Sequence, residues 1–201
     1  MAFPHVVLAR LYEHIEPVDR GARYEDPLDE VIAKAGIGRV TGGGSQLGTH
    51  GAIEHADIEM ELANLDGALG VVAGALEAAG APEGSELVDG STGHVLRTFG
   101  SQQCLAIFLD GTSLPDEVYA DLDFDAVVTE IGAAAGDDSF RGIWQGPEET
   151  GLFFWGRDAE AMFAGVDPVL RRLPIGQNAR VVIREGRSAA GPREVRIPRR
   201  Q

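Results

Sequence analysis

Ionisable residues at every second position are the first feature of this sequence that could do chemistry. His55, Asp57, Glu59 and Glu61 alternate with apolar residues, so all four would project from one face of a β-strand. A histidine and three carboxylates could bind a divalent cation or supply a general acid and base. Alternate strand residues lie about 7 Å apart, and the sequence identifies no further ligand on a neighbouring strand. We interpret these four residues, called the acidic stripe below, as a solvated or partner-facing surface, and expect no metal ion and no catalytic residue.

A run of three glycines followed by a serine, residues 42–45, invites comparison with a phosphate-binding loop. Such a loop needs glycines that lead into a helix N-terminus, and its P-loop form also needs a lysine. Here the glycines lead towards another strand, and Lys34 is the only lysine in the sequence. We expect a bulge or close backbone packing at this run, and no cofactor.

Cys104 is the only cysteine, so the chain has no internal disulfide, which fits a reducing compartment. It opens an apolar stretch with no histidine close in sequence, and free cysteines are among the most buried residues. We expect Cys104 in the core. Nucleophile elbows, zinc-type spacings and Walker motifs are missing from the sequence. These absences favour a protein that is not an enzyme, without deciding the matter.

Aromatic residues gather in the second half of the chain, where Trp144 and Trp155 flank a Gly-Pro turn and Trp155 follows two phenylalanines. One interpretation places these rings in the hydrophobic core. The other makes Trp144 and Trp155 an exposed aromatic anchor, because aromatic residues are enriched at interface hot spots. The sequence leaves both open.

The elements that would position these residues follow one order twice. In the first half we expect strands over 5–15, 38–47, 53–62 and 86–88, a turn over 18–25, and helices over 26–35 and from Asn64 to Gly80. In the second half we expect strands over 104–109, 140–145, 150–155 and 179–185, a helix over 123–135, and a helix from Asp158 that is bent or interrupted near Pro168.

Strand, helix, strand, strand, helix, strand in each half is the ferredoxin-like, or split βαβ, order. We therefore predict an α+β protein of two tandem ferredoxin-like (βαββαβ) units, with antiparallel sheets packed by helices on one face. The expected division is residues 1–90, a linker at 91–101, a second unit at 102–188 and a basic C-terminal tail at 189–201. This architecture resembles bacterial proteins of the tandem ferredoxin-like kind, and the resemblance implies no particular activity.

Apolar residues on both faces of the second-half strands are unusual for antiparallel strands with one solvated face. Leu105 and Ile107 alternate with Ala106 and Phe108, all of them apolar. We infer that the open sheet faces pack on each other, within one chain or between the two chains of a homodimer.

Charge excludes some ligand classes. The 201 residues include 17 basic and 32 acidic side chains, a net charge of −15 that repels nucleic acids and anionic membranes. Residues 1–170 hold eight basic and 30 acidic side chains, a net of −22, whereas 171–201 hold nine arginines and two glutamates. The basic end could lie on the acidic body, or its last four arginines, Arg193, Arg196, Arg199 and Arg200, could dock on an acidic partner.

These features together favour a non-catalytic, acidic protein-binding factor, of inhibitor or immunity type, that engages a basic protein partner in a bacterial cytosol. A cytoplasmic location is expected because the sequence contains neither a signal-peptide pattern nor an apolar stretch long enough to span a membrane. The alternative is an enzyme or small-ligand regulator with a pocket between the two halves. A structural subunit that dimerises through its sheets is a third possibility.

Overall fold

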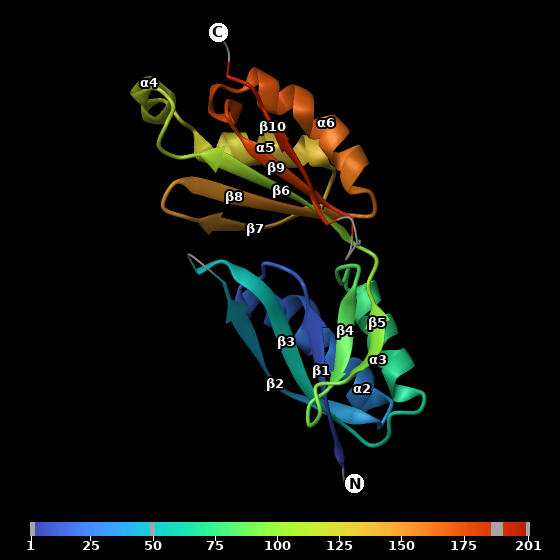
Figure 1. Cartoon of the computed structure of the whole chain (residues 1–201). Helices are drawn as coiled ribbons and strands as arrows, with labels where there is room; N and C mark the ends of the chain where they lie inside the picture. Colours follow the sequence, from blue (N-terminus) through green and yellow to red (C-terminus); the bar gives the residue numbers. More distant parts are fainter. Residues whose placement is uncertain (1–2, 49–50, 186–190, 200–201) are drawn as a thin grey trace. The chain divides into compact units, whose positions relative to one another are not determined.

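Two antiparallel sheets, one in each half of the chain, organise the fold. The computed structural model describes residues 3–48, 51–185 and 191–199, and the chain divides into two units, Met1–Ser101 (unit 1) and Gln102–Gln201 (unit 2). In the described part of each unit the sheet has five strands, and every pair of neighbouring strands is antiparallel (Figure 1).

Unit 1 follows the order strand, helices, strand, strand, helix, strand, strand, and its sheet has the strand order β2-β3-β1-β4-β5. The elements are β1 (His5–Leu11), α1 (Pro17–Arg20), the π-helical turn η1 (Gly21–Glu25), α2 (Asp26–Lys34), β2 (Gly38–Leu47), β3 (Ile53–Leu62), α3 (Ala68–Ala78), β4 (Ser85–Asp89) and β5 (Val95–Phe99).

Unit 2 repeats this plan with the strand order β10-β9-β6-β8-β7. Its elements are β6 (Gln103–Asp110), α4 (Asp116–Ala120), α5 (Phe124–Ala135), β7 (Phe140–Gln145), β8 (Glu149–Gly156), α6 (Ala159–Arg172), the 3-10 turn η3 (Pro174–Gly176), β9 (Arg180–Arg184) and β10 (Arg193–Arg196). When each unit is numbered from its own first strand, both sheets have the order 2-3-1-4-5. The first four strands and two packed helices are the ferredoxin-like arrangement, so the predicted fold class is confirmed.

The core of each unit lies between one face of its sheet and its helices. In β3 the apolar set of Ala56, Ile58, Met60 and Leu62 is fully buried, because alternation turns all four towards α2 and α3. Unit 2 builds its own core in the same way, with β6, β8 and β9 packed against α5 and α6. Burying each large aliphatic side chain contributes about 1.5–3 kcal/mol, which stabilises the packing of helices on the sheet.

The two fifth strands fall where the sequence indicated a linker and a tail. Val95–Phe99, expected in the linker at 91–101, forms β5 and pairs with β4. Arg193–Arg196, expected in the tail at 189–201, forms β10 and pairs with β9. Ile197, just after β10, is 2% exposed in the unit 2 core. Edge strands are stabilised by backbone hydrogen bonds to one neighbour, so their composition need not be apolar. Residues 189–190 and 200–201 of the predicted tail, which include Arg200, lie outside the described residues.

Residues 17–25, most of which were expected to form a turn, are helical through α1 and η1. Tyr24 explains why: its ring is completely buried in the unit 1 core, and its hydroxyl donates a hydrogen bond to Glu13 at 2.7 Å. A buried aromatic anchor therefore fixes a segment whose polar composition is typical of a loop. Among the described residues, the helices are all too short or too polar to cross a membrane.

Candidate functional site

The acidic stripe lies on the sheet face of unit 1 that points away from the helices. Strand β3 is an interior strand, and the exposed or half-exposed residues of its stripe alternate with the buried core residues. The pairing places Arg10 of β1 directly opposite Asp57, and Arg39 of β2 directly opposite Glu61. The structure thus brings basic residues from both neighbouring strands beside the carboxylates that the sequence singled out.

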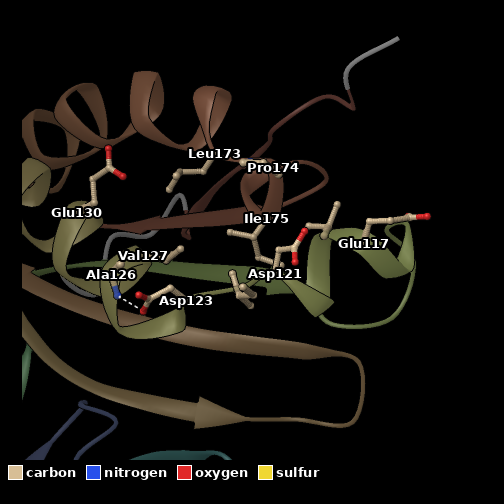
Figure 2. Close-up of a pocket in the computed structure, with 11 residues that line it drawn as sticks. Glu117, Asp121, Asp123, Ala126, Val127, Glu130, Leu173, Pro174 and Ile175 are labelled. Carbon is tan, nitrogen blue, oxygen red and sulfur yellow. Dashed lines mark hydrogen bonds between the residues drawn. The ribbon is translucent and has the colours of Figure 1, made fainter.

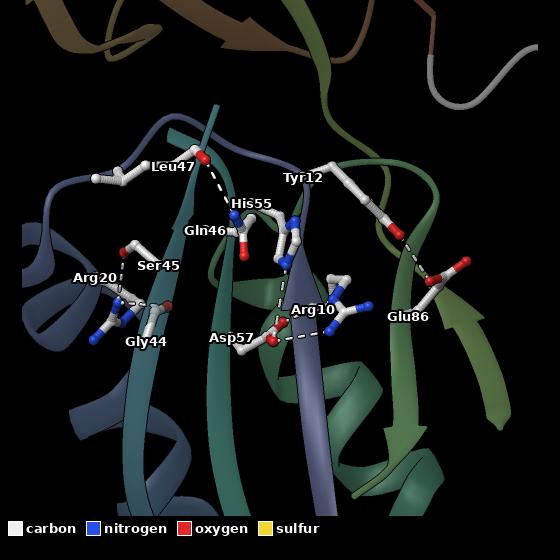
Figure 3. Close-up of polar contacts among 10 residues, drawn as sticks. All are labelled: Arg10, Tyr12, Arg20, Gly44, Ser45, Gln46, Leu47, His55, Asp57 and Glu86. Carbon is white, nitrogen blue, oxygen red and sulfur yellow. Dashed lines mark hydrogen bonds and ion pairs between the residues drawn. The ribbon is translucent and has the colours of Figure 1, made fainter. Parts of the chain in front are cut away.

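Most of the stripe's negative charge is neutralised within the sheet. Arg10 donates two hydrogen bonds to Asp57, from Nε to Oδ1 at 3.0 Å and from Nη2 to Oδ2 at 2.9 Å (Figure 3). The hydrogen bond to Asp57 is also the main reason that the pKa of Arg10 lies above its ordinary value. Arg39 donates to Glu61 at 2.7 Å. These pairs leave Glu59, which accepts a hydrogen bond from Thr41 at 3.0 Å, as the carboxylate of the stripe with a neutral partner.

His55 and two further polar residues extend the network beyond the stripe. The His55 Nε2 atom lies 3.9 Å from Asp57 Oδ2, and the imidazole ring meets the edge of the Tyr12 ring with 6.0 Å between ring centroids. Tyr12 in turn donates a hydrogen bond to Glu86 at 2.8 Å (Figure 3). Sequence reasoning identified His55 and Asp57 but missed Arg10, Tyr12 and Glu86, because these partners come from strands distant in the chain. Among residues 3–48, 51–185 and 191–199, no His, Cys, Asp and Glu residues are grouped closely enough to hold a metal ion.

The glycine run lies in the edge strand β2, where the register shifts between Val40 and Gly42. A side chain at Gly43 would place its Cβ 2.8 Å from the Asp57 backbone oxygen, so only glycine fits without movement. Arg20, which is 6% exposed, donates to the Gly44 carbonyl at 3.0 Å and forms an ion pair with Glu25. Close packing over this buried arginine explains Gly43, whereas a Cβ at Gly42 or Gly44 would meet no atom within 4 Å; the strand geometry offers no phosphate cradle.

Cys104 and the tryptophans occupy the unit 2 sheet face that points away from the helices. Cys104 and Trp155 are buried in a small cluster separate from the helix-covered core. Trp144 is half-buried and meets the edge of the Phe108 ring with 6.3 Å between centroids. Arg180 stacks its guanidinium 3.9 Å from the same Phe108 centroid. The aromatic anchor proposed at Trp144 and Trp155 stays a prediction, as does the packing of the two open faces.

Unit 2 contains an apolar pocket with carboxylates among its lining residues. Its volume is about 410 Å³, within the range typical of ligand sites (Figure 2). It lies among α4, the loop that follows it, the first turns of α5, and the segment from the end of α6 into η3. The residues that line it are Glu117, Val118, Asp121, Leu122, Asp123, Ala126, Val127, Glu130, Leu173, Pro174 and Ile175.

Helix capping holds one side of this pocket in place. The Asp123 side chain accepts a hydrogen bond from the Ala126 backbone nitrogen at 3.0 Å, which caps the N-terminus of α5 (Figure 2). Pro115 precedes α4, and the acidic residues Asp116 and Glu117 fill the first turn of that helix. Carboxylates at helix N-termini interact favourably with the helix dipole, so these acids stabilise the local fold, and two of them, Glu117 and Asp123, also line the pocket.

Residues 111–140, called the acidic segment below, give the pocket its charge. They contain eight carboxylates and no basic residue. Among the described residues, Glu130 pairs with Arg172, whereas Glu117 and Asp121 have no ion-pair partner. Both of these residues are exposed. Sequence reasoning missed this site, although the absence of any cation over thirty residues was a readable signal.

Comparisons with known proteins do not add to this description. No family model matches the chain, and a comparison with curated proteins finds no match. Among solved structures, the chain is similar to the regulatory subunit of aspartate kinase from Thermus flavus, with 14% identity, 83% of this chain and 93% of that chain covered, and a TM-score of 0.27. It is also similar to a putative monooxygenase from Lactobacillus acidophilus NCFM, with 13% identity, 82% of each chain covered and a TM-score of 0.26. Similarities at this level assign the chain neither a family nor an activity.

Proposed function

We propose that this chain is a non-catalytic, acidic protein-binding factor, of inhibitor or immunity type, that engages a basic protein partner in a bacterial cytosol. The observation that carries the proposal is the acidic segment, whose eight carboxylates are accompanied by no basic residue over thirty positions. Charge of one sign concentrated on a surface steers an oppositely charged partner and raises the association rate.

The distribution of arginines in unit 2 supports this choice of surface. Arg171 pairs with Asp167, Arg180 with Glu149, and Arg193 with Glu160, so the basic C-terminal region lies on carboxylates of its own unit. Two further arginines approach the acidic segment: Arg172 pairs with Glu130, and Arg199 donates to Ser113. The remaining carboxylates of the segment keep their charge available to a partner.

Unit 1 supplies a weaker candidate surface. Its acidic stripe is the feature that the sequence favoured, yet Arg10 and Arg39 compensate two of its three carboxylates. An incoming basic partner would have to displace these arginines, whereas Glu117 and Asp121 of the acidic segment are exposed and have no described cation to displace. We therefore place the interaction on unit 2.

The test is affinity capture followed by measured binding. The immobilised chain is exposed to a bacterial lysate at low and high salt, and a captured protein is then purified and titrated against the double variant Glu117→Gln with Asp121→Asn. We expect a basic partner whose affinity falls with salt and falls about three- to tenfold in this variant, since each exposed ion pair contributes about 0.2–1 kcal/mol.

A matched control separates local charge from total charge. The double variant Glu30→Gln with Asp66→Asn removes the same charge from exposed positions of unit 1, outside the acidic segment. It should bind the partner almost as well as the unmodified chain does. Recovery of no partner, or of one whose affinity ignores salt, would contradict the proposal.

A further inference from the structure

The floor of the apolar pocket is lined by aliphatic side chains. Val118, Leu122 and Val127 line it from the α4 and α5 side, and Leu173 and Ile175 line it from the other side. Val127 and Ile175 belong to the buried core of unit 2, so the floor is held rigid by the packing beneath it. An aliphatic or aromatic side chain placed here would be removed from water without breaking any hydrogen bond.

The carboxylates at the rim of the pocket favour a positively charged ligand. Glu117 comes from α4, and Asp121 and Asp123 come from the residues between α4 and α5, whereas Glu130 of α5 already pairs with Arg172. Figure 2 shows the Asp121, Asp123 and Glu130 carboxylates around the apolar side chains of the floor. The ligand that complements this site therefore combines an apolar body with more than one cation.

We propose that this pocket receives one apolar side chain of a basic protein segment, whose neighbouring lysines or arginines contact the rim carboxylates. The inference rests on the proposed function and names the chemistry of the partner at that same site. A peptide segment fits better than a compact amine, because the carboxylates of Glu117, Asp121 and Asp123, which are spaced along α4 and the residues after it, match several cations spaced along a chain. Interfaces of this kind concentrate their affinity in a buried anchor surrounded by a polar rim.

The probe is a pair of labelled synthetic peptides, Gly-Lys-Lys-Leu-Lys-Lys-Gly and the same peptide with serine in place of leucine. Binding to the full chain is measured by fluorescence anisotropy at low salt. We expect the leucine peptide to bind about 10- to 100-fold more tightly, because burying a leucine side chain contributes this factor. In methyl NMR spectra the leucine peptide should shift the signals of Val127 and Ile175.

A pocket-filling variant and its control locate the anchor. Ala126 is exposed on α5 and lines the pocket, so Ala126→Phe should occupy the space without changing the charge. We expect it to weaken the leucine peptide at least tenfold and to leave the serine peptide unchanged. Ala133 is exposed on the same helix and is not a pocket residue, so Ala133→Phe should bind both peptides as the unmodified chain does.

Each contrary result has a separate meaning. Equal affinity for the two peptides, or an Ala126→Phe variant that binds the leucine peptide normally, overturns the pocket inference, while salt-sensitive capture of a basic partner keeps the proposed function. If benzyltrimethylammonium occupies the pocket and the leucine peptide does not, the site belongs to a small cation and the inference is overturned. Failure of the proposed function would instead appear in the capture experiment. Either no partner would be captured, or the captured partner would bind the charge variants as tightly as it binds the unmodified chain.

Discussion

Replacing Asp110 with asparagine should destabilise unit 2 in a way that depends on pH. Asp110 ends β6 and is 8% exposed. Its carboxylate accepts hydrogen bonds from the backbone nitrogens of Thr112 at 3.0 Å and Ser113 at 2.7 Å, from the Ser113 hydroxyl, and from Asn178 Nδ2 at 2.5 Å. The Ser113 hydroxyl also accepts a hydrogen bond from Arg199 at 2.6 Å. This one carboxylate therefore joins the end of β6 to two later parts of the chain.

The magnitude follows from these contacts. Burial by itself raises the pKa of Asp110, but the hydrogen bonds from Ser113, Thr112 and Asn178 outweigh it and hold the pKa well below its usual range. The asparagine side chain carries no charge, and its amide NH2 group would face N–H and O–H donors that now bond to the carboxylate. Since a hydrogen bond to a charged group contributes about 1.5–3 kcal/mol and several act together here, we expect Asp110→Asn to lower the free energy of unfolding by about 3 kcal/mol at pH 7.

The pH dependence has a definite sign. A carboxylate whose pKa is lowered by folding contributes its full stabilisation above its unfolded pKa, near 4, and loses it as the pH falls towards the folded pKa. The stability difference between the unmodified chain and Asp110→Asn should therefore shrink by about 1 kcal/mol between pH 7 and pH 3.

Urea unfolding followed by tryptophan fluorescence is the assay, because both tryptophans, Trp144 and Trp155, lie in unit 2. Asp116→Asn, an exposed residue of α4 in the same unit, controls for the loss of one charge and should change stability by less than about 0.5 kcal/mol. The reasoning is refuted if Asp110→Asn unfolds at the same urea concentration as the unmodified chain at pH 7, or if the difference is as large at pH 3.

Three further predictions concern unit 1. Tyr24→Phe leaves the buried Glu13 without the hydroxyl donor and should reduce stability by about 1–3 kcal/mol in urea unfolding followed by circular dichroism; no change would contradict the buried contact. Gly100→Ala should lower the melting temperature, because Gly100 has a φ of 95° and an alanine Cβ there would lie only 1.7 Å from the Pro82 backbone oxygen. A variant as stable as the original would show that this turn rearranges freely. The Asp89 carboxyl should titrate by NMR with a pKa of about 2, chiefly because the Ser91 hydroxyl donates a hydrogen bond to it. Ser91→Ala should raise the pKa of Asp89, and an unchanged pKa in this variant would exclude the Ser91 hydrogen bond as the cause.

The order of elements could be predicted because it is expressed in local patterns. The alternation from Ile53 to Leu62 reflects a strand with one buried face, and the observed register turns those apolar residues into the core. The edge strands β5 and β10 were missed because their stability comes from backbone pairing, which leaves little mark on composition. Residues 18–25 were misjudged as a turn because one buried ring, Tyr24, outweighs a polar local sequence.

The candidate sites, like the elements, could be predicted from the sequence only where the signal is local. Spacing alone placed the acidic stripe on one sheet face, but Arg10 and Arg39, which compensate it, lie 47 and 22 residues away from their partners in the chain. The apolar pocket combines residues 117–130 with residues 173–175, and nothing local to either stretch indicates that they meet.

The sequence by itself determined the net charge, its uneven distribution and the periodicity of the strands, since composition is independent of folding and periodicity follows from the geometry of the chain. Tertiary structure alone decided which carboxylates are neutralised and where apolar surface is hollowed into a pocket. Both outcomes depend on distances between side chains far apart in the sequence, and electrostatic and packing energies are set by those distances in space.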